Sequence, residues 1–194
     1  MNIASSVKNH FQLQDSKTLS LAYEASVLMF GVSCLYLLSQ LRLHMPWTPV
    51  PITGQSLGVL IIAASFGFKR GISTVTSYIA LGAMGLPVFA GPASGMAYLT
   101  GATGGYLLGF IVAASVIGLL VDHTQYFKKH RTSLALFFIG HSLIFLCGGL
   151  VLSQFIGWNA VWLQGVAPFL PGAILKTIIA GALVPKLYQF TNRV

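Results

Sequence analysis

Lys176 is the most costly residue of this chain to bury, because it lies inside a long apolar stretch near the C-terminus. An ammonium inside a membrane-spanning helix costs at least ~2.5 kcal/mol unless it reaches water or an anion. Pro171 suits the first turn of such a helix, and helical side chains lean toward the N-terminal end. We therefore expect the ammonium to point toward the surface where this helix begins and to pair there with a carboxylate on a ligand. Plain snorkelling of the ammonium to water is the alternative.

Two other apolar stretches contain polar groups that need partners. Gln55 lies at the start of one, and a buried primary amide needs partners for two N–H donors and one acceptor. A ligand contact and a hydrogen bond between helices explain Gln55 equally well. His141 lies deep in another stretch, where we expect a hydrogen bond to a neighbouring helix. No two histidines show a metal-binding spacing and only three acids are present, so the sequence does not predict an enzyme.

The segment from Phe89 to Phe110 contains six glycines and no charged residue. Surface linkers are normally polar, so such a segment is better suited to pack at a membrane boundary and to enclose a small molecule. A second segment, Met45–Thr53, contains three prolines, which favour a stiff extended loop. Its Trp47 is either part of a lid over a ligand or an anchor at the membrane interface, and we place no site on it.

The composition predicts an integral membrane protein, surrounded by membrane lipid. Hydrophobic residues make up 55% of the chain and charged residues only 7%, far below the charged fraction of soluble domains. A net charge of +8 would suggest nucleic acid as the partner of a soluble protein, but here the bases lie between apolar stretches, where they determine topology. We expect no nucleic-acid partner, no cofactor and no metal. Cys34 and Cys147 are interpreted as buried small residues without a disulfide.

Six stretches are long enough to cross a bilayer as helices. A basic turn at Lys69 and Arg70 separates the second from the third, because adjacent cations resist burial in hydrocarbon. We expect an all-α integral membrane protein with six transmembrane helices, folded as a single domain over residues 1–194 with a cytoplasmic N-terminal segment at residues 1–20. The predicted spans are Ala22–Leu41, Ile52–Phe68, Ile72–Phe89, Thr103–Val121, Leu134–Ile156 and Pro168–Phe190.

The distribution of basic residues predicts the orientation of these spans. With the N-terminus in the cytoplasm, nine lysines and arginines lie in cytoplasmic segments and only Arg42 lies in an outer loop. Both termini are then cytoplasmic, and Lys176 lies near the outer end of its span. All three acids are predicted to lie toward the cytoplasmic side, away from Lys176. The predicted outer loops are residues 42–51, 89–102 and 157–167.

Five motifs together resemble the BioY family of biotin transporters. Each motif alone is weak, but their order and spacing from about Trp47 to Lys176 make the resemblance specific. It implies the substrate-binding component of an energy-coupling factor transporter, with six helices and biotin held near the outer face. The motifs are Thr48-Pro-Val-Pro-Ile-Thr53, Lys69-Arg-Gly71, Leu81-Gly-Ala-Met-Gly-Leu-Pro-Val-Phe-Ala-Gly91, Thr103-Gly-Gly-Tyr-Leu-Leu-Gly-Phe110 and Pro171-Gly-Ala-Ile-Leu-Lys176.

The resemblance also implies a binding site. Biotin has an apolar bicyclic body, a ureido group and a carboxylate, which call for aromatic walls, a few polar groups and a cation. Lys176 would pair with the carboxylate, and glycines would let the backbone approach the ligand closely. The other predicted substrate-binding residues are Tyr98, Phe89, Tyr106, Gly91, Gly95, Gly101, Gln55 and Asn159.

Ala173 departs from the family pattern, which usually has an aspartate at this position. Alanine cannot accept a hydrogen bond from a ligand, and Gln55 and Asn159 are the candidates to replace the lost acceptor. The chain contains no G-x-x-x-x-G-K-[ST] phosphate loop, so it does not hydrolyse ATP by that route. The resemblance implies a transmembrane coupling protein and two ATPase subunits as partners in the bacterial cytoplasmic membrane.

Two alternatives stay open at this point. One is a transporter that works alone on another small carboxylate-bearing molecule, such as a biotin precursor. The other is a non-catalytic, purely structural membrane subunit, which would leave Lys176 and the charge-free outer loops without a purpose.

Overall fold

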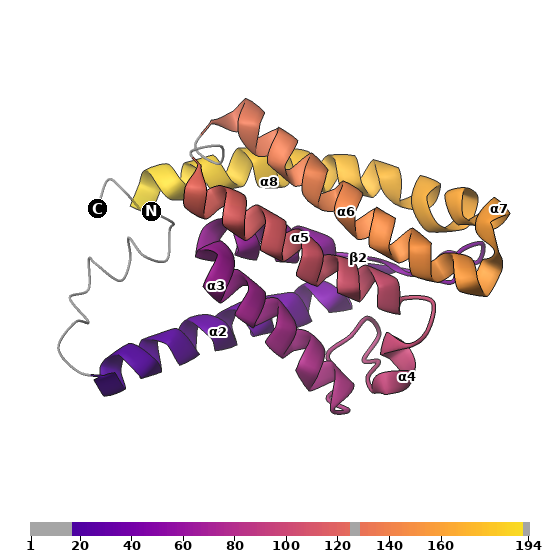
Figure 1. The fold of residues 1–194 in the computed structure, drawn as a ribbon, viewed down its shortest axis with the longest axis horizontal. Helices are drawn as coiled ribbons and strands as arrows, with labels where there is room; N and C mark the ends of the chain where they lie inside the picture. Colours follow the sequence, from indigo (N-terminus) through magenta and orange to yellow (C-terminus); the bar gives the residue numbers. More distant parts are fainter. Residues whose placement is uncertain (1–16, 125–128, 192–194) are drawn as a thin grey trace.

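The structure, a computed structural model, describes residues 17–124 and 129–191. These residues form a bundle of helices with one short β-hairpin (Figure 1), and most of the predicted N-terminal segment at residues 1–20 lies outside the described residues. The hairpin pairs β1 (Arg42–Leu43) with β2 (Ile52–Thr53). The helices are α2 (Lys17–Gln40), α3 (Gln55–Ala83), α4 (Met96–Leu99), α5 (Gly104–His123), α6 (His130–Ile156), α7 (Trp158–Val161), η2 (Trp162–Val166), η3 (Ala167–Phe169) and α8 (Leu170–Thr191).

Five segments of the described chain are long and apolar enough to cross a membrane, in agreement with the predicted class of all-α membrane protein. The sequence predicts six spans, and the difference arises because α3 combines most of the second and third predicted spans in one element. The five segments are Leu19–Gln40, Gln55–Ala83, Gly104–His123, His130–Ile156 and Trp158–Tyr188.

α3 is interrupted at Gly67, where φ is 77° and ψ is −172°. This backbone conformation is strained for any residue with a Cβ, so glycine allows the helix to break inside the junction where the sequence predicts a turn. The two halves of α3 pack against each other, since a Cβ added at Gly71 would lie 3.0 Å from the Cα of Ala63. Asp122 of α5 stabilises the interrupted backbone by accepting a hydrogen bond from the N–H of Phe68 at 2.9 Å.

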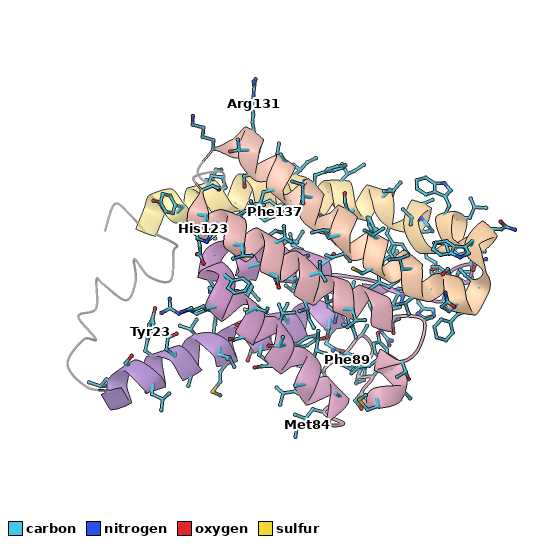
Figure 2. The ribbon with its side chains drawn as sticks, viewed as in Figure 1. Tyr23, Met84, Phe89, His123, Arg131 and Phe137 are labelled. Carbon is cyan, nitrogen blue, oxygen red and sulfur yellow. The ribbon has the colours of Figure 1, made fainter. Side chains whose placement is uncertain are left out.

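The core lies between α3, α5 and α6, and α8 packs on α6. Small residues let helices of a membrane bundle approach closely. Gly109 of α5 is one of these, because a Cβ there would lie 2.9 Å from the Cα of Ile144 in α6. Ile117 of α5 and Phe137 of α6 are fully buried, and Figure 2 shows Phe137 inside the bundle. The close approach of α5 and α6 builds one side of the site described below.

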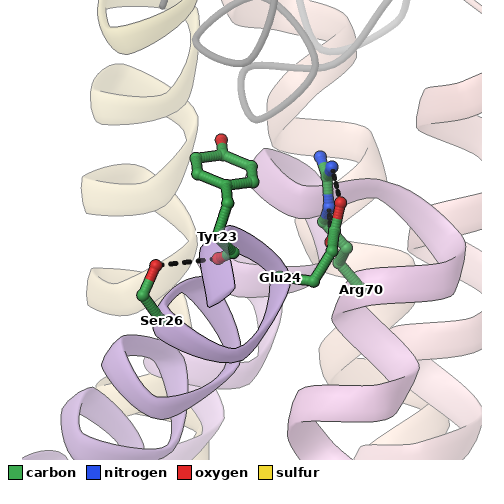
Figure 3. Close-up of polar contacts among 4 residues, drawn as sticks. All are labelled: Tyr23, Glu24, Ser26 and Arg70. Carbon is green, nitrogen blue, oxygen red and sulfur yellow. Dashed lines mark hydrogen bonds and ion pairs between the residues drawn. The ribbon is translucent and has the colours of Figure 1, made fainter. Parts of the chain in front are cut away.

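α2 lies at the edge of the bundle (Figure 1), and few of its residues are buried, as expected for a helix that faces lipid. An ion pair joins it to α3: Arg70 Nε and Nη2 each contact a carboxylate oxygen of Glu24 at 2.6 Å (Figure 3). The Arg70 guanidinium also lies 5.7 Å from the centre of the Tyr23 ring. Arg70, which the sequence assigns to a turn, therefore also holds α2 against the second half of α3.

The prediction that residues 157–167 form a loop is wrong, because the structure places α7, η2 and the first residue of η3 there. Gly157, with φ of 76°, ends α6, and no proline occurs after it until Pro168. The apolar segment between them can therefore form helical turns. Figure 1 shows α4, α7 and the connection between β1 and β2 at one end of the bundle, whereas α2 begins at the other.

Candidate ligand-binding site

A pocket lies between the first turns of α3, α5 and α8 and the middle of α6, and the connection before β2 closes one side. It contains about 550 Å³ of space, part of it open to solvent. We name it the Lys176 pocket. Its lining residues are Val50, Pro51, Thr53, Gln55, Ser56, Tyr98, Thr103, Tyr106, Leu107, Phe110, His141, Ile144, Phe145, Phe169, Ala173 and Lys176.

Lys176 contributes the positive charge of this pocket. Its ammonium donates to the carbonyl oxygen of Thr53 and to Ser56 Oγ, the latter at 3.1 Å, and so bridges α8 to β2 and α3. Both partners are uncharged, and Lys176 forms no ion pair with any residue in the described part of the chain. The acids of that part, Glu24 and Asp122, lie at the α2–α3 contact and at the break in α3. The pocket therefore contains a partly buried cation without a counter-ion from the described residues.

Gln55 lies in the pocket wall and takes part in a hydrogen-bond network of the protein. Its Nε2 donates to the hydroxyl of Tyr78 at 2.6 Å, and its Oε1 accepts from Thr53 Oγ1 at 3.0 Å. The Tyr78 hydroxyl donates to the carbonyl oxygen of Val88 at 2.7 Å. Gln55 therefore joins the two halves of α3 and the β-hairpin, which is one of the two roles that the sequence allows.

Aromatic rings form much of the wall. The ring centres of Tyr106 and Phe169 lie 5.9 Å apart, and those of Phe145 and Phe169 lie 6.3 Å apart. The Tyr106 hydroxyl donates to the carbonyl oxygen of Gly165 at 2.7 Å, which holds α5 against η2. Tyr98 of α4 adds a half-buried ring, and burial raises the pKa of its hydroxyl, which therefore stays protonated at neutral pH.

Five predicted residues are not part of the lining: Phe89, Gly91, Gly95, Gly101 and Asn159. Phe89 is fully buried near α4 (Figure 2), with ring centres of Tyr78 and Tyr98 at 5.7 and 4.9 Å. Gly91 lies against the Arg42 guanidinium, and Asn159 is exposed on α7. Phe89 therefore supports Tyr98 from behind, whereas the structure does not bring Asn159 to the pocket.

The pocket also contains residues that the sequence did not indicate as ligand contacts. Thr53 and Ser56 lie beside Gln55, so the sequence contained a signal for them, namely a short polar cluster before an apolar stretch. Phe145 and Phe169 had no such signal, because they are two of 13 phenylalanines. His141 makes the contact to a neighbouring helix that the sequence predicts, since its Nδ1 lies 3.0 Å from Thr177 Oγ1 on α8.

Comparison with known proteins identifies the family. The model of the BioY family matches residues 11–193, which is nearly the whole chain. The chain belongs to the BioY family. This match confirms the resemblance of the five sequence motifs, and this BioY chain is accordingly a multi-pass protein of the cytoplasmic membrane.

Three BioY relatives illustrate the range of similarity. The probable biotin transporter BioY of Pyrococcus horikoshii is 36% identical over 139 residues, which cover 72% of this chain and 81% of the relative. The biotin transporter BioY of Thermotoga maritima is 37% identical over 146 residues, which cover 75% and 85%. The biotin transporter BioY2 of Lactococcus lactis subsp. cremoris is 31% identical over 176 residues, which cover 88% and 94%.

A solved structure shares the fold of this BioY chain. It is the crystal structure of the S-component for biotin from an ECF-type ABC transporter, with a TM-score of 0.77 and 23% sequence identity. The match covers 90% of this chain and 95% of the other chain. It shows that this chain shares the overall fold of that structure.

Proposed function

We propose that this protein binds biotin in the Lys176 pocket and mediates the uptake of biotin across the cytoplasmic membrane. The observation that carries the proposal is the ammonium of Lys176, which lies in the pocket without a carboxylate partner among the described residues. A buried cation without a counter-ion is costly, and the carboxylate of biotin supplies one. The names of the relatives support the same ligand, since all three are biotin transporters or probable biotin transporters.

The remaining walls suit the rest of biotin. Tyr106, Phe145 and Phe169 offer apolar faces to the bicyclic body, and polar groups of the pocket are available to the ureido group. Tyr98 closes the wall on the side of α4. Four of the five predicted residues that do not line the pocket act indirectly, because they hold the connection that carries Tyr98. They are Phe89, Gly91, Gly95 and Gly101.

The proposed topology has six crossings and cytoplasmic termini, with the two halves of α3 contributing two crossings. The break at Gly67 supports this count, because a helix that folds back there returns toward the side from which it came. The connections at residues 42–51 and 89–102 then face outward together with α7, at the end of the bundle that contributes the pocket (Figure 1). Biotin enters from the outer side.

Energy for transport would come from partners. The chain contains no phosphate loop, and the solved structure of similar fold is an S-component of an ECF-type ABC transporter. We therefore place a transmembrane coupling protein and two ATPase subunits beside this chain. α2, with its large exposed apolar surface, is available to such a partner or to lipid.

Equilibrium binding of radiolabelled biotin to the purified protein in lipid nanodiscs tests the proposal. Saturable binding that Lys176→Met weakens would support it. Lys186→Met is the matched control, because Lys186 is an exposed lysine of the same helix, and it should bind biotin as the wild type does.

Three results would contradict parts of the proposal. Lack of saturable biotin binding would remove biotin as the substrate and would favour another small-molecule substrate, whereas lack of any saturable ligand would favour the purely structural subunit. Stronger binding of dethiobiotin than of biotin would indicate a precursor transporter. Biotin uptake into liposomes that contain this chain alone would show that no ATPase module is required.

A further inference from the structure

His141 of α6 has one ring nitrogen without a protein partner. The residue is only 4% exposed and lies in the wall of the Lys176 pocket. Its Nδ1 lies 3.1 Å from the carbonyl oxygen of Phe137 and 3.0 Å from Thr177 Oγ1. Its Nε2, on the other edge of the ring, is buried and has no hydrogen-bond partner within residues 17–124 and 129–191. Buried polar atoms without a partner are uncommon, so this nitrogen indicates a ligand contact.

The contact of Nδ1 with the carbonyl oxygen of Phe137 favours a ring proton on Nδ1, with Thr177 Oγ1 as a second neighbour that can accept from it. The carbonyl oxygen of Phe137 can only accept, so its contact with Nδ1 is a hydrogen bond when Nδ1 carries the proton. A neutral imidazole with a proton on Nδ1 has a lone pair on Nε2. A second proton would create a buried cation in the same pocket as Lys176, where the lining contains no carboxylate. We therefore assign the ring proton to Nδ1, which makes Nε2 of His141 a hydrogen-bond acceptor.

His141 also borders an apolar groove between α6 and α8, lined in part by Phe138, Ile174 and Ile178. These three side chains are exposed on the surface of a membrane protein and so face lipid. Acyl chains offer no N–H donor to an acceptor nitrogen. Of the two cavities that His141 lines, the Lys176 pocket is therefore the one suited to a polar ligand.

We infer that Nε2 of His141 accepts a hydrogen bond from a ureido N–H of biotin. This inference rests on the proposed function. The carboxylate of biotin has no hydrogen to donate, and the only N–H groups of biotin belong to its ureido ring. The two polar ends of the ligand therefore have different partners, with the anion at Lys176 and an N–H donor at His141. Phe145, with its ring centre 6.4 Å from that of His141, helps to hold the imidazole in place.

Two substitutions at this position separate a ligand contact from a purely structural one. His141→Asn retains an N–H near the position of Nδ1 and removes Nε2, whereas His141→Gln retains an amide oxygen near Nε2 and loses the contacts of Nδ1. A ligand contact predicts that His141→Asn lowers biotin affinity about tenfold, the effect of one hydrogen bond, and that His141→Gln retains most of the affinity. A structural role predicts the reverse order. Thr177→Val is the control, because it removes a partner of Nδ1 and leaves Nε2 in place.

Biotin analogues that are methylated on one or the other ureido nitrogen identify the contact without any variant. The wild type should bind one of the two analogues about tenfold more weakly than biotin, because methylation removes the donor. His141→Asn should lose this discrimination and should keep the wild-type discrimination against biotin methyl ester. Melting temperatures of the ligand-free variants show whether each variant is folded.

Several results would overturn the inference. One is a wild type that binds both N-methyl analogues as tightly as biotin. Another is a folded His141→Asn variant that binds biotin with wild-type affinity. A third is a folded His141→Asn variant that loses the discrimination against biotin methyl ester and keeps the discrimination against the N-methyl analogues. A wild type that binds no biotin at all would instead contradict the proposed function.

Discussion

Gly82→Ala tests how the protein positions Tyr98 at the pocket. A Cβ at Gly82 would lie closer than 3.0 Å to three ring atoms of Phe89, so the ring would have to move. Phe89 is fully buried between Tyr78 and Tyr98, whose ring centres lie 5.7 and 4.9 Å away. Because the ring is fully buried, a shift of the ring presses it against neighbouring side chains. The added methyl group therefore disturbs Tyr98 as well as the core.

The size of this effect follows from the overlap. Overpacking of a close-packed core costs about 1 to 3 kcal/mol, and three overlapping atoms of a fully buried ring place Gly82→Ala near the upper value. A loss of about 3 kcal/mol lowers the folding equilibrium constant roughly 100-fold. Displacement of Tyr98 should also weaken biotin binding about three- to tenfold, because the ring is one wall of the pocket.

SDS titration followed by circular dichroism measures the stability of the purified protein. Gly172→Ala is the matched control, because a Cβ there would meet only Ile52 Cγ2 at 3.9 Å. The change from glycine to alanine also raises the helix propensity equally in both variants. The double variant Gly82→Ala/Phe89→Leu should recover much of the loss, because leucine is smaller than the ring. A Gly82→Ala variant as stable as Gly172→Ala would refute the reasoning about Phe89.

Three further substitutions test other contacts. Arg70→Met should lower stability by about 1 kcal/mol without changing biotin affinity, because it breaks a partly exposed ion pair with Glu24. SDS titration checks this, and a Glu24→Gln variant that loses nothing would contradict it. Gly67→Ala should cost about 1 to 3 kcal/mol in the same assay, because alanine would have to adopt φ of 77°, and wild-type stability would argue against the break in α3. Tyr106→Phe should lower the free energy of unfolding by about 1 to 2 kcal/mol, because the carbonyl oxygen of Gly165 loses its donor. The melting temperature should fall accordingly. An unchanged melting temperature would show that this hydrogen bond contributes little.

Much of the helical fold could be predicted from the sequence, because a bilayer demands apolar stretches of a minimum length. Lys69 and Arg70 correctly indicated a break between the second and third stretches, but the residue that breaks the helix is Gly67, whose positive φ the sequence does not reveal. Residues 157–167 were predicted to be a loop because they connect the fifth and sixth predicted spans. Their mostly apolar side chains instead allow helical turns between Gly157 and Pro168.

The site could be predicted only in part. A cation or an amide inside an apolar stretch needs an explanation, and so the sequence indicated Lys176 and Gln55, both of which line the pocket. Phe145 and Phe169 could not be distinguished from other apolar residues, because only the packing of α5, α6 and η3 brings them together. The unpartnered Nε2 of His141 depends on which ring nitrogen meets α8, and this is a property of the folded bundle.

The most direct test of the central claim compares the binding of biotin and biotin methyl ester to the wild type and to Lys176→Met. Pairing of a buried ammonium with a carboxylate predicts that the wild type binds the ester roughly 100-fold more weakly than biotin. Lys176→Met should bind the two ligands with similar, low affinity, because the charge that distinguishes them is gone. Equal affinities in the wild type, or an ester penalty that persists in Lys176→Met, would contradict the capture of the biotin carboxylate by Lys176.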